Sequence, residues 1–512
     1  MQLTAIDTST FSPEALQYFL SQNKHINKLE NEIEILKEQI NLLLQKRFGR
    51  SSEQYDPNQQ SLFVKEEEQD VSLPETEKQE IKSYTRNKPG RKPLDPKLPR
   101  VEKIIDISEE EKECACGHKM NKIGEETGEK LQIEPAVIYV EKTIRPKYAC
   151  QHCEGTEDED RPAVRIAPVP PSIIPRSIAS PSLLSYIMVQ KYQDHLPFHR
   201  QETQFLRIGA EISRQDMSNW QQQIYNFLSP LFSLLKEIIK TGPVMRMDET
   251  TSQVMGEEDR KDTQKSYIWL LKGGPPRKTI VLYEYRETRT AKNAIELLEG
   301  FSGYLQTDGY EGYDAAARNL PGIIHVGCFA HSRRKFIDAS KATKKPQSAE
   351  EGIKFIRKLY EIERNLREAK LEDDDFVSER KKLAEPVLTD FHRWLNKRAN
   401  EVLPSCLLGK AVAYTLKQWD KLIKYLESPY LTPDNNAAEN SIRPYVLGRK
   451  NFLFNKSPDG ARSSCGMFTL IETAKQNGVE PLKYLNELFE KAPYAVSPED
   501  WEKLLPWNIF NS

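Results

Sequence analysis

The sequence predicts a multidomain α+β protein built around a mixed β-sheet. The 512 residues exceed the roughly 100–200 that one domain usually holds. Strand-like and helix-like runs alternate from about residue 241 to 340, and the residues on either side read mainly as helices. Two stretches of biased charge, 64–80 and 86–100, mark a linker nearer the N-terminus.

Composition argues against a membrane or secreted protein. Charged residues make up 29% and apolar residues 38%, and no apolar run reaches the about 18 residues of a membrane span. The first residues lack the charged and apolar regions of a signal peptide. We therefore expect a cytoplasmic protein whose seven cysteines are thiols or metal ligands rather than disulfides. The net charge of −2 does not decide for or against a nucleic-acid partner.

Residues 1–50 are predicted to form a coiled-coil dimerisation helix. Apolar side chains repeat every seven positions at two heptad sites: Phe19, Ile26, Ile33 and Ile40, and Leu29, Leu36 and Leu43. Isoleucine at one site and leucine at the other favour a parallel two-stranded coil, and hence a homodimer. An amphipathic helix packed on its own chain is the alternative. Residues 51–100 follow as a flexible linker, first acidic and then basic. Its basic part is either an extended arm on DNA phosphates or a stiff solvated linker.

Residues 101–160 are predicted to form a zinc-ribbon-like domain. Two cysteine pairs flank a β-rich, turn-bounded stretch: Cys114 and Cys116, then Cys150 and Cys153. Four thiolates complete a tetrahedral Zn²⁺ shell. The first pair has one intervening residue rather than two, so His118 or His152 can replace one thiolate. A small domain that keeps its cysteines without metal is the alternative.

Residues 161–240 are predicted to form a helical DNA-binding domain. Two short helical patterns flank Gly209, and Ser213 caps the second, which begins with Arg214. This layout is typical of a helix-turn-helix, in which the second helix reads DNA from its N-terminal end. Any hairpin of two helices satisfies the same pattern.

Residues 241–475 are predicted to form the core domain. Its elements run in the order three strands, helix, strand, helix, strand, helix. Hairpin strands followed by βα units give a mixed sheet with helices on its faces, which is the RNase H-like arrangement. Three or four amphipathic helices at about 341–430 form an all-α insertion, and a helical tail occupies 476–512.

Three acidic residues of this core are candidate metal ligands. Asp248 lies within the first predicted strand and Asp308 at the tip of the fourth, so adjacent strands bring the two carboxylates together. Two close carboxylates repel unless a cation lies between them, and hard oxygen ligands suit Mg²⁺ or Mn²⁺. Glu439, on a helix after the insertion, is the third candidate. An ordinary i, i+4 ion pair with Arg443 is the alternative explanation for Glu439.

Several long phrases resemble the insertion-sequence-66 family of bacterial transposases, in order from about residue 40 to the C-terminus. They include MDETTSQV (247–254), TDGYEGYDAA (307–316), VGCFAHSRRKF (326–336) and DNNAAENSIRPYVLGRKNFLF (434–454). The resemblance implies a DDE-type transposase that cuts and joins DNA at the terminal inverted repeats of its element. It also implies that Asp248, Asp308 and Glu439 are the catalytic triad, holding two Mg²⁺ ions.

The same resemblance implies the partners. Element ends and target DNA are the expected ligands, accessory proteins of the same element are expected, and the protein is expected at the bacterial nucleoid. Eight side chains are candidate DNA contacts: Arg214, His331, Arg333, Arg334, Lys335, Arg443, Arg449 and Lys450. A solvated helix face is the alternative for each cation.

The chain departs from the family pattern at two places. The family's acid is usually followed by Arg, whereas Asn440 follows Glu439 here, and the first cysteine pair is C-x-C rather than C-x-x-C. Both changes leave the three carboxylates in place, so we expect a competent active site. A catalytically silent DNA-binding regulator and an RNase H-like nuclease without strand transfer are the rival functions.

Overall fold

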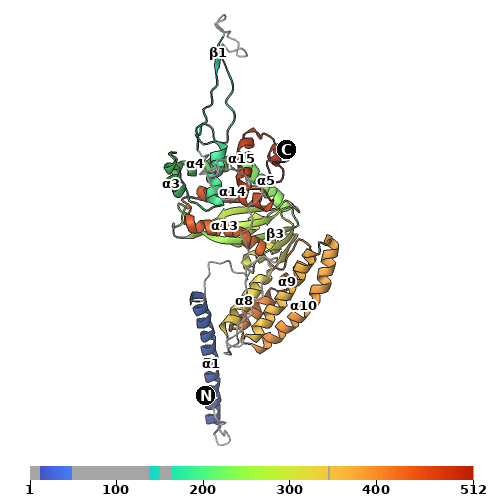
Figure 1. The fold of residues 1–512 in the computed structure, drawn as a ribbon. Helices are drawn as coiled ribbons and strands as arrows, with labels where there is room; N and C mark the ends of the chain where they lie inside the picture. Colours follow the sequence, from blue (N-terminus) through green and yellow to red (C-terminus); the bar gives the residue numbers. More distant parts are fainter. Residues whose placement is uncertain (1–11, 49–137, 150–163, 344–345, 511–512) are drawn as a thin grey trace, which may run out of the picture. The chain divides into compact units, whose positions relative to one another are not determined.

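The computed structural model describes residues 12–48, 138–149, 164–343 and 346–510 (Figure 1). The chain divides into two units, one of residues 67–145 and one of the remaining residues. The predicted linker and the four cysteines of the predicted zinc ribbon lie outside the described residues. A short antiparallel pair, β1 (Lys147–Ala149) and β2 (Val164–Ile166), flanks residues 150–163 in the sequence. No helix in the described part of the chain is long and apolar enough to cross a membrane.

The N-terminal helix α1 (Pro13–Phe48) confirms the helix that the heptads predict. All of its predicted heptad side chains except the half-buried Phe19 are exposed in the single chain: Ile26, Ile33 and Leu36, for example, have exposed fractions of 42%, 50% and 56%. Two-stranded coils bury such a seam against a partner helix. Dimerisation through α1 stays a prediction.

The central sheet has five strands in the order β5-β4-β3-β6-β7. They are β3 (Val244–Gln253), β4 (Lys265–Gly273), β5 (Ile280–Arg286), β6 (Gly303–Gln306) and β7 (Ile323–Val326). The first three pair antiparallel, whereas β6 pairs parallel with both β3 and β7. Parallel neighbours need crossover connections, and two helices provide them: α6 (Ala291–Leu298) and α7 (Glu311–Asn319). The structure thus confirms the α+β class and the mixed sheet.

Between β2 and the five-stranded sheet, the described chain forms four helices: α2 (Pro181–Tyr192), α3 (Phe198–Arg207), α4 (Arg214–Phe227) and α5 (Ser229–Ile238). A short 3-10 turn, Ile239–Thr241, leads from α5 to β3. Gly209 has φ +84° and turns the chain between α3 and α4. Ser213 caps α4, because its hydroxyl accepts the backbone N–H of Asp216 at 3.1 Å. The two predicted helices and their turn are present, and Arg214 is exposed where α4 begins.

Helix α14 (Pro458–Gln476) covers the edge strand β5. The hydroxyl of Thr469 accepts the backbone N–H of Tyr283 at 3.0 Å, and that of Thr473 accepts the N–H of Val281 at 3.1 Å. These side chains satisfy donors that an edge strand leaves unpaired. Helix α13 (Asn436–Phe452) packs against β3 and β4.

The predicted all-α insertion follows α8 (Phe329–Ala342). It consists of α9 (Gln347–Glu368), α10 (Asp373–Glu401), α11 (Leu407–Lys417), α12 (Trp419–Leu422) and a 3-10 turn, Ile423–Glu427. Figure 1 shows α9 and α10 side by side, and the rings of Phe355 and Phe391 stack between them with centroids 5.0 Å apart. A fully buried ion pair, Arg380 with Glu363 at 2.8 Å, also joins the two helices.

The C-terminal tail packs into the same core as the sheet. It contains α15 (Pro481–Lys491), a 3-10 turn (Ala492–Tyr494) and α16 (Pro498–Lys503). Leu485, Leu488 and Phe489 of α15 are fully buried in an apolar cluster that also holds side chains of α2, α4 and β4. The predicted boundaries between 161–240, 241–475 and 476–512 therefore run through one continuous core, and as domain limits they stay predictions.

Candidate active site

Asp248 and Asp308 come from neighbouring strands of the sheet. Asp248 lies within β3, directly after the buried Met247, and its Oδ1 accepts the backbone N–H of Glu249 at 2.9 Å. Asp308 lies two residues beyond the end of β6, and its Oδ1 accepts the backbone N–H of Tyr310 at 3.0 Å. Because β3 and β6 pair in parallel, the chain after each strand leads toward the same edge.

Glu439 lies in the first turn of α13, and contacts to two other elements hold the start of this helix. The side-chain amide of Asn435 donates to the carbonyl oxygen of Met247, the residue before Asp248, at 2.8 Å. The backbone N–H of Asn435 donates to the sulfur of Cys328, at the start of α8, at 3.2 Å. Asn435, the residue before α13, therefore links the helix that carries Glu439 to the strand that carries Asp248.

The three carboxylates interact electrostatically. Burial, followed by the negative charges of Glu249, Glu439 and Asp308, raises the pKa of Asp248 to about 8. The negative charges of Glu439 and Asp308 both contribute to this shift, so each of the other two predicted acids lies within electrostatic interaction distance of Asp248. A divalent cation among them would favour the ionised form of each. The carboxylates thus fit such a cation by charge and by ligand type.

Sequence reasoning missed two residues beside this cluster, Glu249 and Arg289. Arg289 pairs with Glu249 and lies 3.9 Å from Asp308, and the hydroxyl of Tyr313 donates to Glu249. The side chain of Glu249 is only 3% exposed. The sequence did carry one signal for Glu249, because it is the second of two consecutive acids within a strand. Alternate strand residues face opposite sides of a sheet, so Asp248 and Glu249 each needed an explanation of their own.

The predicted cations have different surroundings. Arg334, on α8, lies 3.4 Å from Glu439 Oε2 and is exposed, as is Lys335, whose ammonium lies 4.6 Å from the ring of Tyr414. The imidazole Nδ1 of His331 lies 3.8 Å from Glu439 Oε1. Three of the predicted DNA contacts thus gather on one turn of α8 beside the acids.

The remaining predicted cations differ in their exposure and in the elements that carry them. Arg449, on α13, donates to the carbonyl oxygen of Thr251 and to the hydroxyl of Thr250 on β3, so it ties the helix to the sheet. Lys450 is exposed, and Arg333 and Arg443 are half-buried. Arg214 belongs to α4 rather than to α8 or α13.

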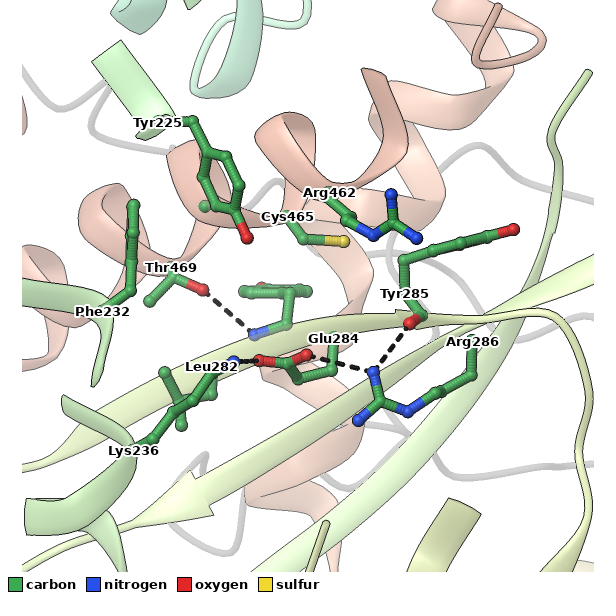
Figure 2. Close-up of a pocket in the computed structure, with 12 residues that line it drawn as sticks. Tyr225, Phe232, Lys236, Leu282, Glu284, Tyr285, Arg286, Arg462, Cys465 and Thr469 are labelled. Carbon is green, nitrogen blue, oxygen red and sulfur yellow. Dashed lines mark hydrogen bonds and ion pairs between the residues drawn. The ribbon is translucent and has the colours of Figure 1, made fainter. Parts of the chain in front are cut away.

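A cavity of about 210 Å³ lies apart from the acids, between α4, α5, β5 and α14 (Figure 2). Its polar wall contains Glu284, which pairs with Lys236 at 2.6 Å and with Arg286 at 3.4 Å. None of the three predicted catalytic acids lines it. The carboxylate cluster is therefore a separate site from this cavity.

Four segments of the chain match known protein families. Residues 176–463, which contain all three acids, match the family described as "Transposase IS66 family", and residues 469–507 match the "IS66 C-terminal element". Residues 111–154 match the "zinc-finger binding domain of transposase IS66" and contain the four predicted cysteine ligands. Residues 35–102 match "Transposase C of IS166 homeodomain". That homeodomain-type match lies nearer the N-terminus than the helix pair at Gly209.

Relatives in Sinorhizobium fredii match most of the chain. The uncharacterized protein y4jD is 32% identical over 425 residues, which is 80% of each chain. The uncharacterized protein y4qI is also 32% identical, over 85% of this chain and 82% of the relative. A third, y4hP, is 28% identical over 94% of this chain and 88% of the relative.

Proposed function

The chain belongs to the IS66 family of transposases, and we propose that it binds the terminal inverted repeats of an insertion element and catalyses Mg²⁺-dependent strand cleavage and strand transfer. The observation that carries this proposal is the convergence of the three acids: Asp248 and Asp308 come from the paired strands β3 and β6, and Asn435 fixes the start of the helix that carries Glu439 to β3. In the proposal the three acids are the DDE triad, and the mixed sheet with its flanking helices is an RNase H-like core.

The three carboxylates would hold the divalent ions. Such ions activate a water or a 3′-hydroxyl and stabilise the leaving oxygen during in-line displacement at phosphorus. The residues around them have supporting roles. Asn435 fixes the start of α13 to β3, which sets the position of Glu439 relative to Asp248. Arg289 partly neutralises Glu249 and Asp308, because it reaches both carboxylates.

The positive side chains of α8 and α13 would hold the DNA backbone beside the acids. Arg334, Lys335 and Lys450 are exposed and able to pair with phosphates. The zinc-finger segment and the helix pair at Gly209 would bind the element ends. A homodimer through α1 would hold two ends together, and accessory proteins of the element would complete the assembly.

The test compares the full-length chain with Glu439→Gln on DNA that carries the element's own end, with Mg²⁺ or with a chelator. Glu490→Gln is the matched control, because Glu490 is an exposed glutamate on α15 that accepts a hydrogen bond from the side-chain amide of Asn486 at 3.2 Å. End binding is measured by gel shift on the same samples. We expect cleavage and strand-transfer products from the chain and from the control, and none from Glu439→Gln or without Mg²⁺.

Other outcomes would favour one of the rival functions, a nuclease or a DNA-binding regulator. Equal cleavage by Glu439→Gln and the intact chain would remove Glu439 from the site and leave ion pairing as its role. Cleavage without strand transfer into supercoiled target DNA would indicate a nuclease. End binding without cleavage, even with the element's accessory proteins added, would indicate a DNA-binding regulator.

A further inference from the structure

Three potential metal ligands of different chemistry converge where α8 begins. Cys328 is the residue before α8, His331 lies three positions later on the same helix face, and Glu439 approaches from α13. One ligand atom of each residue, a sulfur, a ring nitrogen and a carboxylate oxygen, lies within 4.8 Å of the other two.

Two of these ligand atoms are buried and lack hydrogen-bond partners. They are Nδ1 of His331 and Oε1 of Glu439. Buried polar atoms are usually paired, and an unpaired one costs about 1–3 kcal/mol. The two atoms are 3.8 Å apart, which is too long for a hydrogen bond. The other oxygen of Glu439 is already paired with Arg334, so Oε1 is the atom left for another ligand.

The separations are close to those around one tetrahedral ion. In a tetrahedral shell, zinc–nitrogen and zinc–oxygen bonds of about 2.0–2.2 Å place two such ligands about 3.4 Å apart. The 3.8 Å between His331 and Glu439 exceeds this separation by a few tenths of an ångström. With a zinc–sulfur bond of about 2.3 Å, the sulfur would lie about 3.6 Å from each partner. All three atoms lie within 4.8 Å of one another, so a closure of at most about 1 Å would bring them to one ion.

The ligand types select a soft cation. Thiolate and imidazole favour Zn²⁺ over Mg²⁺, which prefers carboxylate and water oxygens. Cys328 is only 3% exposed, and its sulfur accepts the backbone N–H of Asn435. Burial raises the pKa of the Cys328 thiol well above its usual range, so a bound cation has to displace the thiol proton. Binding would release the thiol proton to solvent.

We propose that Cys328, His331 and Glu439 form a Zn²⁺ site that competes with Mg²⁺ for Glu439. Zn²⁺ bound there withdraws the third acid from the DDE triad, so it inhibits DNA cleavage. The inhibitory part rests on the proposed function, whereas the binding part does not. The site is distinct from the zinc-finger segment at 111–154.

The first experiment measures binding without any activity. Metal-free full-length protein is titrated with Co²⁺, a spectroscopic substitute for Zn²⁺, and the thiolate charge-transfer absorption is followed to saturation. We expect Cys328→Ser to bind one equivalent less than the intact chain, while the zinc-finger signal persists in both. Cys406→Ser is the matched control, because Cys406 also precedes a helix and its sulfur accepts a backbone N–H, from Gly409 at 3.3 Å.

A second variant and a second readout complete the test. His331→Gln should also lose the extra equivalent, which keeps the test valid if Cys328→Ser folds poorly. In the cleavage assay, the Zn²⁺ concentration for half-inhibition should rise at least about tenfold in Cys328→Ser, because it has lost a ligand. Equal Co²⁺ stoichiometry in the intact chain and both variants would overturn the proposal. If no cleavage occurs at all, the proposed function fails while the titration still decides the metal site.

Discussion

Arg380 should contribute several kcal/mol to the stability of the helical insertion. Its side chain has no exposed surface and pairs with Glu363 at 2.8 Å. The guanidinium also donates to three carbonyl oxygens, those of Tyr425, Ser428 and Leu431, at 2.7, 2.8 and 3.1 Å. Arg380→Met keeps the apolar part of the side chain but removes the charge and all four hydrogen bonds.

The expected loss follows from these contacts. Removing one partner of a buried ion pair costs about 3–5 kcal/mol. Glu363 retains a second partner, Arg367 at 2.8 Å, which lowers the cost. The carbonyls that lose their donor raise it, by about 1–3 kcal/mol for each that stays buried and unpaired. We therefore expect the free energy of unfolding to fall by about 3–5 kcal/mol.

Urea unfolding of full-length protein measures this loss. With a slope of about 3 kcal/mol per molar urea, the midpoint should fall by more than about 1 M. The matched control is Arg393→Met on the same helix, where Arg393 pairs with Asp390 and its side chain is 74% exposed. That substitution should cost less than about 1 kcal/mol. Equal midpoints for the two variants would refute the reasoning that burial makes the Arg380 contacts strong.

Three further substitutions test other parts of the structure. Phe391→Ala should lower the free energy of unfolding by about 3–5 kcal/mol in urea, since its ring is fully buried, and a loss under 1 kcal/mol would contradict this packing. Gly242→Ala should lower the melting temperature, because its Cβ would lie 2.1 Å from the carbonyl oxygen of Gly274; an unchanged melting temperature would show that the segment before β3 and the segment after β4 do not approach so closely. Burial raises the pKa of Asp434 from 3.8 to about 6, so the folded chain binds this proton more tightly than the unfolded chain. Its stabilising contribution is full below the unfolded pKa and is lost as pH rises through the folded pKa. Relative to Asp434→Asn, the intact chain should therefore lose roughly 1 kcal/mol between pH 5 and 7, and a constant difference between the two would exclude this shift.

The order of elements in the core was predictable because each element has a clear local pattern. Short apolar runs bounded by turns mark β4 and β5, and helical spacing marks α6, α7 and α8. The chain order also predicted that the strands of Asp248 and Asp308 would be neighbours, and β3 does pair with β6. The helical insertion was predictable for the same reason, since its amphipathic repeats are long.

Contacts between distant segments were not predictable from one sequence. Nothing near Asn435 indicates that its side chain reaches Met247, or that the sulfur of Cys328 lies beside it. Glu439 was a candidate from its helix after the insertion and from the resemblance to a family, but no local pattern indicated that Arg334 and His331 lie within 4 Å of its carboxylate. Long-range pairing depends on how the whole chain packs, which local periods do not specify.

The late covering of the sheet by α14 has a consequence for protein synthesis. The backbone N–H of Val281 on β5 donates to the hydroxyl of Thr473, which is synthesised 192 positions later. At about 5–20 residues per second, a ribosome needs about 10–40 s to make that stretch. During this interval the nascent chain exposes an edge strand that other unfinished chains can pair with. When chaperones are depleted, newly made chains should therefore aggregate, whereas molecules that were completed and folded earlier should stay soluble.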